Sequence, residues 1–175
     1  MCVAFLNVPI FEKAQNFKWD IMISKSCKYA IRAVVFIASQ APKNGKPGVK
    51  EIAEEIEAPQ AFTAKILQSL SKYKIVTSLK GPYGGFYCES YQLELPVIEI
   101  VNAIDGLAVF KECVMGLHNC TDEHPCPMHY KYAETRNNLL LSFQQTTIGN
   151  LASDLTRGNV YLKNKNLSCR MVNLK

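Results

Sequence analysis

A short segment in the second half of the chain gathers side chains that could bind a metal. Cys113, Cys120 and Cys126 fall within fourteen residues, and His129 comes three residues after the last of them. Glycine, proline, asparagine and aspartate recur in this segment, and these residues favour turns over helix or strand. We therefore expect a loop, and thiols and an imidazole gathered in one loop point to metal ligation.

The donor types alone leave the bound species open. Three thiolates and one imidazole suit a structural zinc ion as well as an iron–sulfur cluster. Reversible oxidation of the thiols is a third use of the same residues. His118 and His124 are rival imidazoles in the same loop, although most loop histidines are simply solvated.

A catalytic Cys/His centre is the competing interpretation. Asp122, Glu123 and His124 are the loop residues suited to acid–base chemistry. No carboxylate pair, phosphate-binding loop or nucleophile motif stands out in the sequence to complete an active site. The sequence therefore predicts that the chain is not an enzyme.

The composition is that of an ordinary globular protein with one main unit. The chain has 175 residues, of which 48% are hydrophobic and 20% are charged, and its formal net charge is +5. Residues 22–90 hold ten Lys or Arg against five Asp or Glu, while the remaining residues balance. That basic half of the chain is the part expected to meet a phosphate backbone.

The cysteine count and the N-terminal residues indicate a cytoplasmic protein. Seven cysteines are an odd number, and residues 1–11 lack the cationic start of a secretory signal. No apolar run approaches the roughly 20 residues of a membrane helix, so we expect reduced thiols that are free to bind metals. Cys27 and Cys88 are expected in the core, and Cys2 and Cys169 in weakly ordered ends.

Three helices are predicted ahead of the cysteine segment. The first starts near Ser24 and ends before the turn-rich residues 42–48, and a shorter one covers residues 49–56. The third runs from about Gln60 to Tyr73, after Pro59, which the first turn of a helix tolerates. The residues predicted to face inward are Cys27, Ala30, Ile31, Val34, Ala38, Val49, Ile52, Ala53, Ile56, Phe62, Ile66, Leu67 and Leu70.

The outward face of the third helix is small, polar and cationic, and it carries no acidic residue. Such a face suits a helix that enters the DNA major groove, where amide, hydroxyl and cationic groups bind bases and phosphates. Two short helices and this face predict a helix-turn-helix, and the alternative is a solvated face on an ordinary three-helix core. The residues of the face are Gln60, Ala61, Thr63, Ala64, Lys65, Gln68, Ser69 and Lys72.

A β-hairpin is predicted directly after the third helix. Residues 75–79 and 86–88 read as strands, and residues 80–85 form a glycine-rich turn. A hairpin in this place makes a winged helix, whose wing reaches the DNA backbone or the minor groove. Glycines at the tip let the main chain approach closely. The turn residues expected at DNA are Lys80, Gly81, Pro82, Tyr83, Gly84 and Gly85.

Two further helices flank the cysteine loop. One follows Pro96 and ends at residues 105–106, and the other covers about residues 127–145. The second is apolar on more than one side, so we expect it to pack against its own domain and against a second subunit. Thr146 or Thr147 then caps a last short helix. The apolar residues are Ile98, Val101 and Ile104 in the first helix, and Leu139, Leu140, Leu141 and Phe143 in the second.

From Met22 to about Leu155 the chain resembles the family of bacterial winged-helix regulators that includes IscR, NsrR and CymR. SKSCKYAIRAVVFIA is similar to the opening helix of that family, IEAPQAFTAKILQSLSK to its recognition helix, and LKGPYGGFYC to its wing. The cysteine loop, the helix after it and TTIGNLASDL are similar to the sensing loop and dimer helix. The resemblance implies a mainly α fold with a small β-hairpin wing: a winged helix-turn-helix followed by a long C-terminal dimerisation helix.

The resemblance also implies a ligand set. Members that bind a [2Fe-2S] or [4Fe-4S] iron–sulfur cluster use three loop cysteines, and IscR-like members add a histidine three residues later. Cys113, Cys120, Cys126 and His129 fit that pattern. The nitric-oxide-sensing branch uses instead an acidic residue from the opening helix of the other subunit, and Lys28 or a neighbour stands at that position here.

Four parts of the chain follow from these predictions. Residues 1–21 are an N-terminal extension, and 22–92 are the winged helix-turn-helix that binds DNA. Residues 93–155 hold a linker helix, the sensor loop and the dimerisation helix, and 156–175 are a tail.

The predicted function is that of a homodimeric transcriptional regulator, a repressor or an activator. It binds a palindromic double-stranded operator and senses iron–sulfur, redox or nitrosative status through the cysteine loop. Ala64 stands where some members carry a glutamate that reads or rejects a base, so the operator sequence does not follow. A zinc- or thiol-based regulator of the same fold, and a module that no longer binds DNA, are the alternatives. The predicted DNA contacts are Lys28, Gln60, Ala61, Thr63, Ala64, Lys65, Gln68, Lys80, Gly81, Pro82, Tyr83, Gly84 and Gly85.

Overall fold

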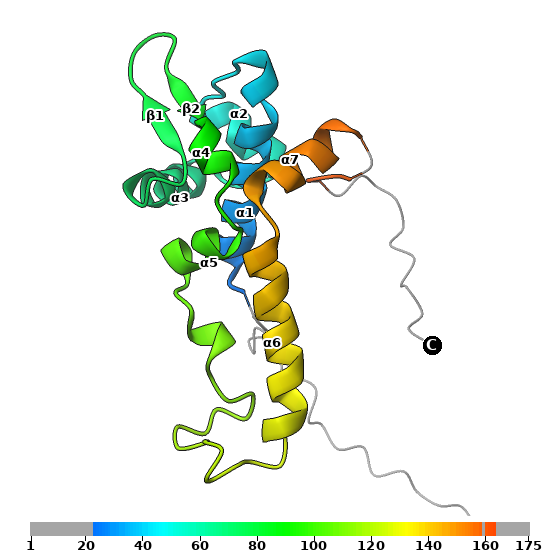
Figure 1. The fold of residues 1–175 in the computed structure, drawn as a ribbon. Coiled ribbons are helices and arrows are strands. Elements are labelled where there is room, and N and C mark those ends of the chain that lie inside the picture. The colour runs from blue at the N-terminus through cyan, green and yellow to red at the C-terminus, as the bar shows by residue number, and fades with distance from the viewer. Residues whose placement is uncertain (1–22, 159, 164–175) are drawn as a thin grey trace, which may run out of the picture.

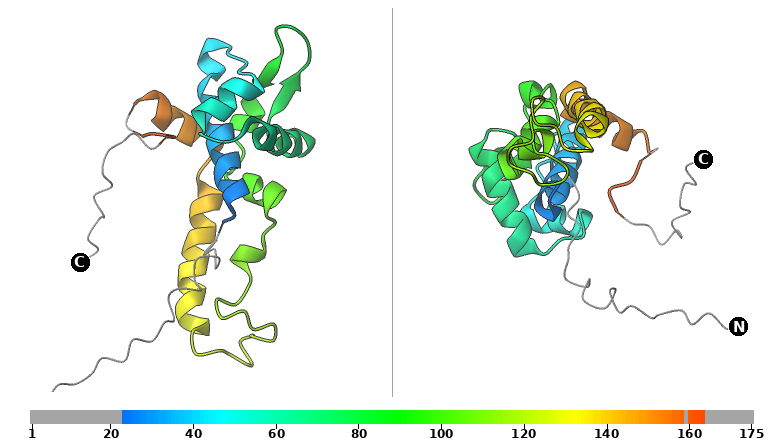
Figure 2. Two further views of the ribbon diagram at one scale, coloured as in Figure 1. Left: turned by 180° about the vertical axis from the view of Figure 1, so that it is seen from behind. Right: turned by 90° about the horizontal axis from the view of Figure 1, so that it is seen from below.

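The computed structural model describes residues 23–158 and 160–163 (Figure 1). The expectations for residues 1–21, for Cys2 and Cys169, and for the tail beyond residue 163 lie outside these residues. The described chain forms a helical head from which one long helix extends, and the cysteine loop lies at the far end of that helix (Figures 1 and 2).

Helix α1, Lys25–Ser39, runs through the core of the head. Ser24 caps its start, because the Ser24 Oγ accepts a hydrogen bond from the Cys27 N–H (3.0 Å). The same serine donates its own N–H (2.8 Å) and its Oγ–H (2.6 Å) to the carboxylate of Asp105. The buried residues of α1 are Cys27, Ala30, Ala33, Val34, Val35, Ile37 and Ala38, which confirms the predicted core position of Cys27.

Helices α2, Val49–Glu55, and α3, Gln60–Lys72, form the helix-turn-helix pair and both pack against α1. A 3-10 turn, η2 (Ala41–Lys43), lies between α1 and α2. Pro59 stands directly before α3 and lacks the N–H that a helix start cannot pair. The predicted order and bounds of these three helices are therefore confirmed to within about a turn.

Thr63 departs from the predicted outward face of α3. Its side chain is fully buried, and its Oγ1–H donates to the carbonyl oxygen of Pro59 (3.1 Å). A hydroxyl fits a buried helix position when it bonds the carbonyl one turn back. Thr63 thus lies on the same stripe as Ile66, Leu67 and Leu70, and the expectation that it faces outward is wrong.

Strands β1, Thr77–Leu79, and β2, Gly85–Tyr87, pair antiparallel and form the predicted wing, with Ser78 opposite Phe86. The first strand is shorter than predicted. Ile75 and Val76 are buried core residues ahead of it rather than strand residues. They lie there because the chain turns sharply at Lys74, whose φ is +59°, and enters the core before it pairs.

The wing lies close to the loop before α2. The N–H of Phe86 donates to the Pro47 carbonyl (3.0 Å). A Cβ built on Gly85 would meet the Lys46 carbonyl oxygen at 2.1 Å, so only glycine fits at this crossing. The sequence prediction assigned this glycine to close approach of DNA, and the structure gives it a packing role within the head.

A four-residue helix, α4 (Ser90–Leu93), follows the wing and was not predicted. Its Gln92 is fully buried, with every polar atom in use. The Gln92 Nε2–H donates to the Lys74 carbonyl (2.8 Å), and its Oε1 accepts from the Glu89 N–H (2.8 Å) and the Thr77 Oγ1–H (3.2 Å). The Gln92 side chain therefore connects Lys74, just after α3, with Thr77 and Glu89 at the base of the wing.

The C-terminal half leaves the head and returns to it. Helix α5, Ile98–Ile104, is followed by a 3-10 turn, η3 (Ala108–Phe110), and then by the cysteine loop. Helix α6, His129–Gln145, runs back toward the head, and α7, Ile148–Thr156, packs on α1 (Figure 1). Thr147 caps α7 by accepting the Asn150 N–H (3.2 Å), as predicted.

Helix α6 packs on the head along one side only. Leu139, Leu140 and Phe143 contact a small apolar cluster, and the rings of Phe143 and Phe110 lie 5.7 Å apart. No residue of α6 is fully buried in this chain, and Leu141 is 47% exposed. The predicted packing on its own domain is therefore confirmed, while the other apolar side is uncovered. The fully or nearly buried members of that cluster are Cys27, Ile98, Val101 and Phe110.

Candidate metal centre and nucleic-acid interface

The fold brings the three loop cysteines together. The Sγ atoms of Cys113, Cys120 and Cys126 all lie within 4.8 Å of one another, and the Cys113 and Cys126 sulfurs are 3.6 Å apart. Cys126 is buried, and the other two are half-buried. The thiols line a small cavity of about 20 Å³ between the loop and the first turns of α6.

His129 reaches this group through one cysteine. It is the first residue of α6, and its Nδ1 lies 3.1 Å from the Cys120 Sγ. The His129 side chain is 14% exposed, and its Nε2 lies 2.8 Å from the carboxylate of Asp122, which is exposed. A carboxylate that accepts a hydrogen bond from one ring nitrogen of a histidine favours the tautomer with the proton on that nitrogen. The other ring nitrogen then carries the lone pair that can bind a metal.

The rival imidazoles are not part of this group. His118 and His124 are both exposed, and the described residues whose ligand atoms all converge are the three cysteines alone. His129 differs from the other two histidines by its 3.1 Å contact with the Cys120 sulfur. Asp122, in contrast, was predicted only as an acid–base candidate of an enzyme. Its role beside His129 depends on a loop conformation that no spacing rule gives.

The loop environment changes the acidity of the thiols. The backbone N–H groups of Leu117 and Met115 stabilise the thiolate of Cys113 and lower its pKa to about 7. At Cys120 the N–H of Cys126 acts to lower the pKa, but burial and the neighbouring thiols outweigh it and the net shift is upward.

The two structural cysteines behave differently. Burial raises the pKa of both Cys27 and Cys88 to about 12, and the charge of Asp105 adds to the effect at Cys27. They are therefore protonated and inert at neutral pH, whereas the loop holds the thiols that are suited to bind metal.

The donor set fits a metal. Thiolates bound to one tetrahedral ion at ~2.3 Å are roughly 3.8 Å apart. The 3.6 Å separation of the Cys113 and Cys126 sulfurs, and the 4.8 Å limit for all three, are close to that spacing. Three thiolates with an adjacent imidazole are also ligands that iron–sulfur clusters accept.

The second candidate surface lies on α3 and the wing, at the other end of the molecule. Gln60, Ala61, Ala64, Lys65 and Gln68 are exposed on α3, as predicted. A groove of about 320 Å³ separates this face from the wing. The residues that line the groove are Ala64, Lys65, Gln68, Ser71, Ser78 and Phe86.

The wing tip projects into solvent. Tyr83 is 93% exposed, and Lys80, Gly81 and Pro82 are exposed beside it. The Gly84 N–H donates to the Gly81 carbonyl (2.9 Å) and closes the turn.

Glycines 84 and 85 are half-buried within the hairpin. Lys28 is exposed on the first turn of α1, the end of that helix that Ser24 joins to Asp105.

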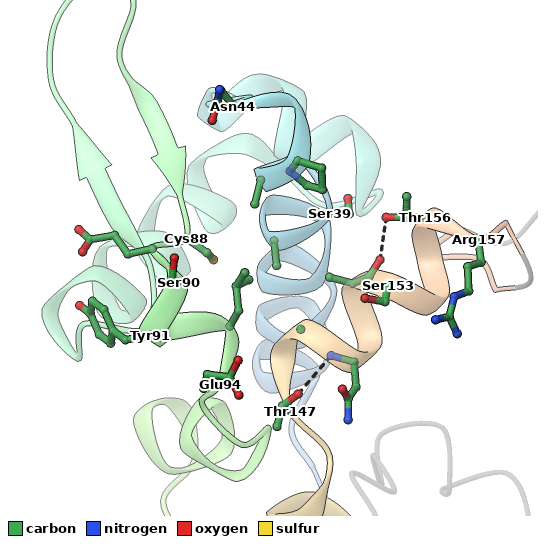
Figure 3. Close-up of a pocket in the computed structure, with 18 residues that line it drawn as sticks. Ser39, Asn44, Cys88, Ser90, Tyr91, Glu94, Thr147, Ser153, Thr156 and Arg157 are labelled. Atoms are coloured by element: carbon green, nitrogen blue, oxygen red, sulfur yellow. Dashed lines mark hydrogen bonds between the residues drawn. The ribbon is translucent and has the colours of Figure 1, made fainter.

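A further hollow of the described chain belongs to neither surface. It is an open groove of about 1320 Å³ between the end of α1, α4 and α7 (Figure 3). Small and hydroxyl-bearing residues line most of it, together with Glu89, Glu94 and Arg157. No set of converging metal-ligating side chains lies in this groove among the described residues.

A helix-turn-helix followed by a wing, with a thiol cluster on a separate long helix, is the architecture of a winged-helix regulator and not of an enzyme. The Rrf2 family model, described as an iron-dependent transcriptional regulator, matches residues 23–154. The chain therefore belongs to the Rrf2 family of transcriptional regulators.

Individual relatives agree with this placement. The chain is 29% identical over 133 residues to a protein of Aquifex aeolicus whose name places it among HTH-type transcriptional regulators, which covers 75% of this chain and 91% of that one. It is 22% identical over 127 residues to the HTH-type transcriptional regulator IscR of Vibrio vulnificus, covering 73% and 74% of the two chains. These names describe the relatives as regulators of transcription.

Solved structures show the same fold. CymR, the global cysteine regulator of B. subtilis, superposes with a TM-score of 0.61 at 21% identity, covering 75% of this chain and 95% of that one. IscR of T. potens superposes with a TM-score of 0.59 at 16% identity, covering 79% and 90%. None of the helices in the described residues is long and apolar enough to cross a membrane.

Proposed function

We propose that this chain is a homodimeric, DNA-binding regulator of transcription whose affinity for its operator depends on metal bound at Cys113, Cys120, Cys126 and His129. The observation that carries the proposal is the convergence of three thiols within 4.8 Å at the far end of the helix that returns to the winged-helix head. We expect it to act in the cytoplasm, on double-stranded DNA.

The DNA contacts follow from exposure and chemistry. Gln60, Ala61, Ala64, Lys65 and Gln68 offer amide, cationic and small side chains at a helix face that is free to enter a major groove. The wing tip, with Lys80 and Tyr83, supplies contacts to the backbone or the minor groove. Thr63 is not among the proposed contacts, because it is buried.

Dimerisation is proposed through α6. The helix has 17 residues, packs on its own head along one side, and leaves Leu141 about half exposed. An apolar side chain on an otherwise uncovered helix face is stabilised when a second copy covers it. Two copies joined along α6 would present two recognition helices to successive major grooves, ~34 Å apart, which is the geometry that reads a palindrome.

The bound species is proposed to be an iron–sulfur cluster, on the family resemblance of the cysteine–histidine pattern. Cys113, Cys120 and Cys126 would supply thiolates, and His129 would present the Nδ1 that Asp122 keeps free of its proton. A cluster supplies redox and ligand-exchange chemistry when it is bound. This chain's own residues would hold it at the end of α6.

A single metal ion is the second candidate, and one observation favours it. The Cys113 and Cys126 sulfurs lie 3.6 Å apart, close to the roughly 3.8 Å expected around one tetrahedral centre. All three sulfurs lie within 4.8 Å of one another. Iron or zinc would fit such a centre. Acid-labile sulfide distinguishes the two candidates, because only a cluster contains it.

Regulation follows from the connections of the loop. Ordering the loop fixes the first turn of α6, and α6 leads directly to α7, which packs on α1 of the head. If the metal favours one arrangement of two heads, it changes DNA affinity, and DNA must change metal affinity by the same factor.

The experiment is anaerobic purification of the full chain, followed by visible absorption and by iron, zinc and sulfide assays. Iron with stoichiometric sulfide supports the cluster, and metal without sulfide supports the single ion. Operator binding is then measured with metal-loaded and metal-free protein over a range of salt concentrations. Equal DNA affinity in the two states, together with unchanged binding by Cys113→Ala and Cys126→Ala, would overturn the sensing proposal.

Lys65→Ala tests the DNA face separately. If Lys65 contacts phosphate, its loss weakens binding to all duplexes and lowers the slope of log K against log salt by about 1. Lys131→Ala, an exposed lysine on α6, is the matched control. The same loss in both variants would assign the effect to net charge and not to a contact of α3.

A further inference from the structure

The wall of the thiol cavity contains a cation that no ligand pattern predicts. Arg136 lies on α6, seven residues after His129, and lines the same cavity as the three cysteines. His129, Tyr132 and Arg136 follow one another at spacings of three and four, so they share one face of the helix. That face of α6 lines one side of the cavity, and residues of the cysteine loop line the other side.

The guanidinium is bonded to the loop at the point where it enters the metal centre. The Arg136 Nη1–H group donates to the Lys111 carbonyl (3.1 Å) and, more weakly, to the Glu112 carbonyl (3.4 Å). These are the two residues directly before Cys113. The ring of Tyr132 lies 6.0 Å from the guanidinium carbon and supports it through a cation–π contact.

One donor of this side chain is unused within the described chain. The Arg136 Nε is buried and has no hydrogen-bond partner. A buried, unpaired donor on a cation is costly and calls for an acceptor. Metal-bound thiolates are anionic acceptors, and the three cysteines that would supply them line the same cavity as Arg136.

We propose that Arg136 is a positioning and charge-compensating residue of the metal centre. Its guanidinium fixes the main chain before Cys113, and its positive charge and free Nε–H stabilise the metal-bound thiolates. This proposal rests on the metal centre proposed above but not on DNA binding. Hydrogen bonds and charge near the sulfurs are among the features by which a protein tunes such a site.

The test is a cobalt(II) titration of metal-free full-length protein under anaerobic conditions, followed by the thiolate-to-cobalt absorption band. Arg136→Met keeps an unbranched apolar stem at this position but removes the charge and the donors. We expect about 10- to 100-fold weaker cobalt binding, the usual loss when a supporting residue of a metal site is removed. The band should also move to longer wavelength, because the sulfur electrons are less stabilised.

Two further variants make the test specific. Lys131→Met removes one positive charge from an exposed position of the same helix and should leave affinity and band unchanged. Arg136→Lys keeps the positive charge but lacks the planar guanidinium and its Nε–H. Its affinity for cobalt should therefore lie between those of wild type and Arg136→Met. A wild-type affinity and band in Arg136→Met, or an equal loss in Lys131→Met, would overturn the proposal.

Thermal unfolding of each variant separates folding from metal binding. If Arg136→Met does not fold, Arg136→Lys decides: weaker cobalt binding supports the proposal, and wild-type binding overturns it. If wild-type protein itself shows no thiolate-to-cobalt band, both the proposed metal centre and the proposed role of Arg136 are contradicted. A protein that binds cobalt but not DNA would leave the role of Arg136 standing and overturn only the proposed regulator.

Discussion

Individual cysteines of this chain have different acidities because of where they lie. The N–H groups of Leu117 and Met115 point to the Cys113 sulfur and lower its pKa to about 7. Burial raises the pKa of Cys27 and Cys88 to about 12. Between pH 6 and pH 8 the thiolate fraction of Cys113 therefore rises through its midpoint, while Cys27 and Cys88 remain protonated.

We expect iodoacetamide to follow these acidities in metal-free, folded protein. Alkylation of Cys113 should accelerate with pH around a midpoint near 7 and precede that of Cys120, whose pKa is raised. Cys27 and Cys88 should react only after unfolding in denaturant. Peptide mass spectrometry over a pH series measures each site. Equal labelling of Cys27 and Cys113 in the native protein would contradict this assignment.

At the level of residues, the sequence predicted the candidate metal ligands better than the residues that hold those ligands in place. The spacing of Cys113, Cys120 and Cys126 indicated one metal site, and the fold brings them together. Asp122 and Arg136 escaped prediction because both act through loop conformation, one on an imidazole and the other on two carbonyls. Thr63 was predicted to face outward because threonine is polar. The sequence does not show that its hydroxyl is satisfied by the Pro59 carbonyl and can therefore be buried.

Among the elements, α4 depends on a single side chain that joins it to the recognition helix region. Gln92→Leu would remove the partner of the Lys74 carbonyl and the Glu89 N–H in a fully buried place. Each lost partner costs about 1–3 kcal/mol, so with two lost partners we expect the free energy of unfolding to fall by roughly 2–6 kcal/mol. Urea unfolding measures it. Gln68→Leu makes the same change at an exposed position and should leave stability nearly unchanged.

The wing is placed by a glycine that has no room for a side chain. In Gly85→Ala the new methyl would lie 2.1 Å from the Lys46 carbonyl oxygen, so the hairpin must move away from the loop before α2. We expect a loss of about 1–3 kcal/mol of stability, typical of overpacking, and weaker DNA binding. Gly48→Ala is the matched control, because nothing lies within 4 Å of that position. Equal thermal stability of the two variants would contradict the packing role.

The longer elements were predictable because they repeat. Helices α1 and α3 carry apolar residues at regular spacing over several turns, and Ser24 and Pro59 mark where they begin. The four residues of α4 are too few to show a periodic pattern. Ile75 and Val76 were predicted as strand residues because they are apolar and β-branched, but they are apolar because they are buried in the core. Short elements are set by the core around them and not by their own sequence.

For the whole molecule, the exposed side of α6 predicts the assembly state. Leu141→Glu places a charge on the uncovered face, and we expect it to dissociate the proposed dimer into monomers with much weaker operator binding. Light scattering coupled to size-exclusion chromatography measures the mass. Leu79→Glu, at a leucine that is 45% exposed on β1, is the control and should remain dimeric. A dimeric Leu141→Glu protein would move the interface away from this face.

The hydrogen bonds between Ser24 and Asp105 give the cysteine loop a second attachment to the head. Asp105 is the residue at which the chain leaves α5 for the loop, and Ser24 caps the helix at the centre of the core. The loop is thus anchored at its start to one end of α1, and through α6 and α7 to the side of the same helix. Because the loop is attached to α1 at both of its ends, we expect a displacement of the loop to be passed to α1 and from there to the head.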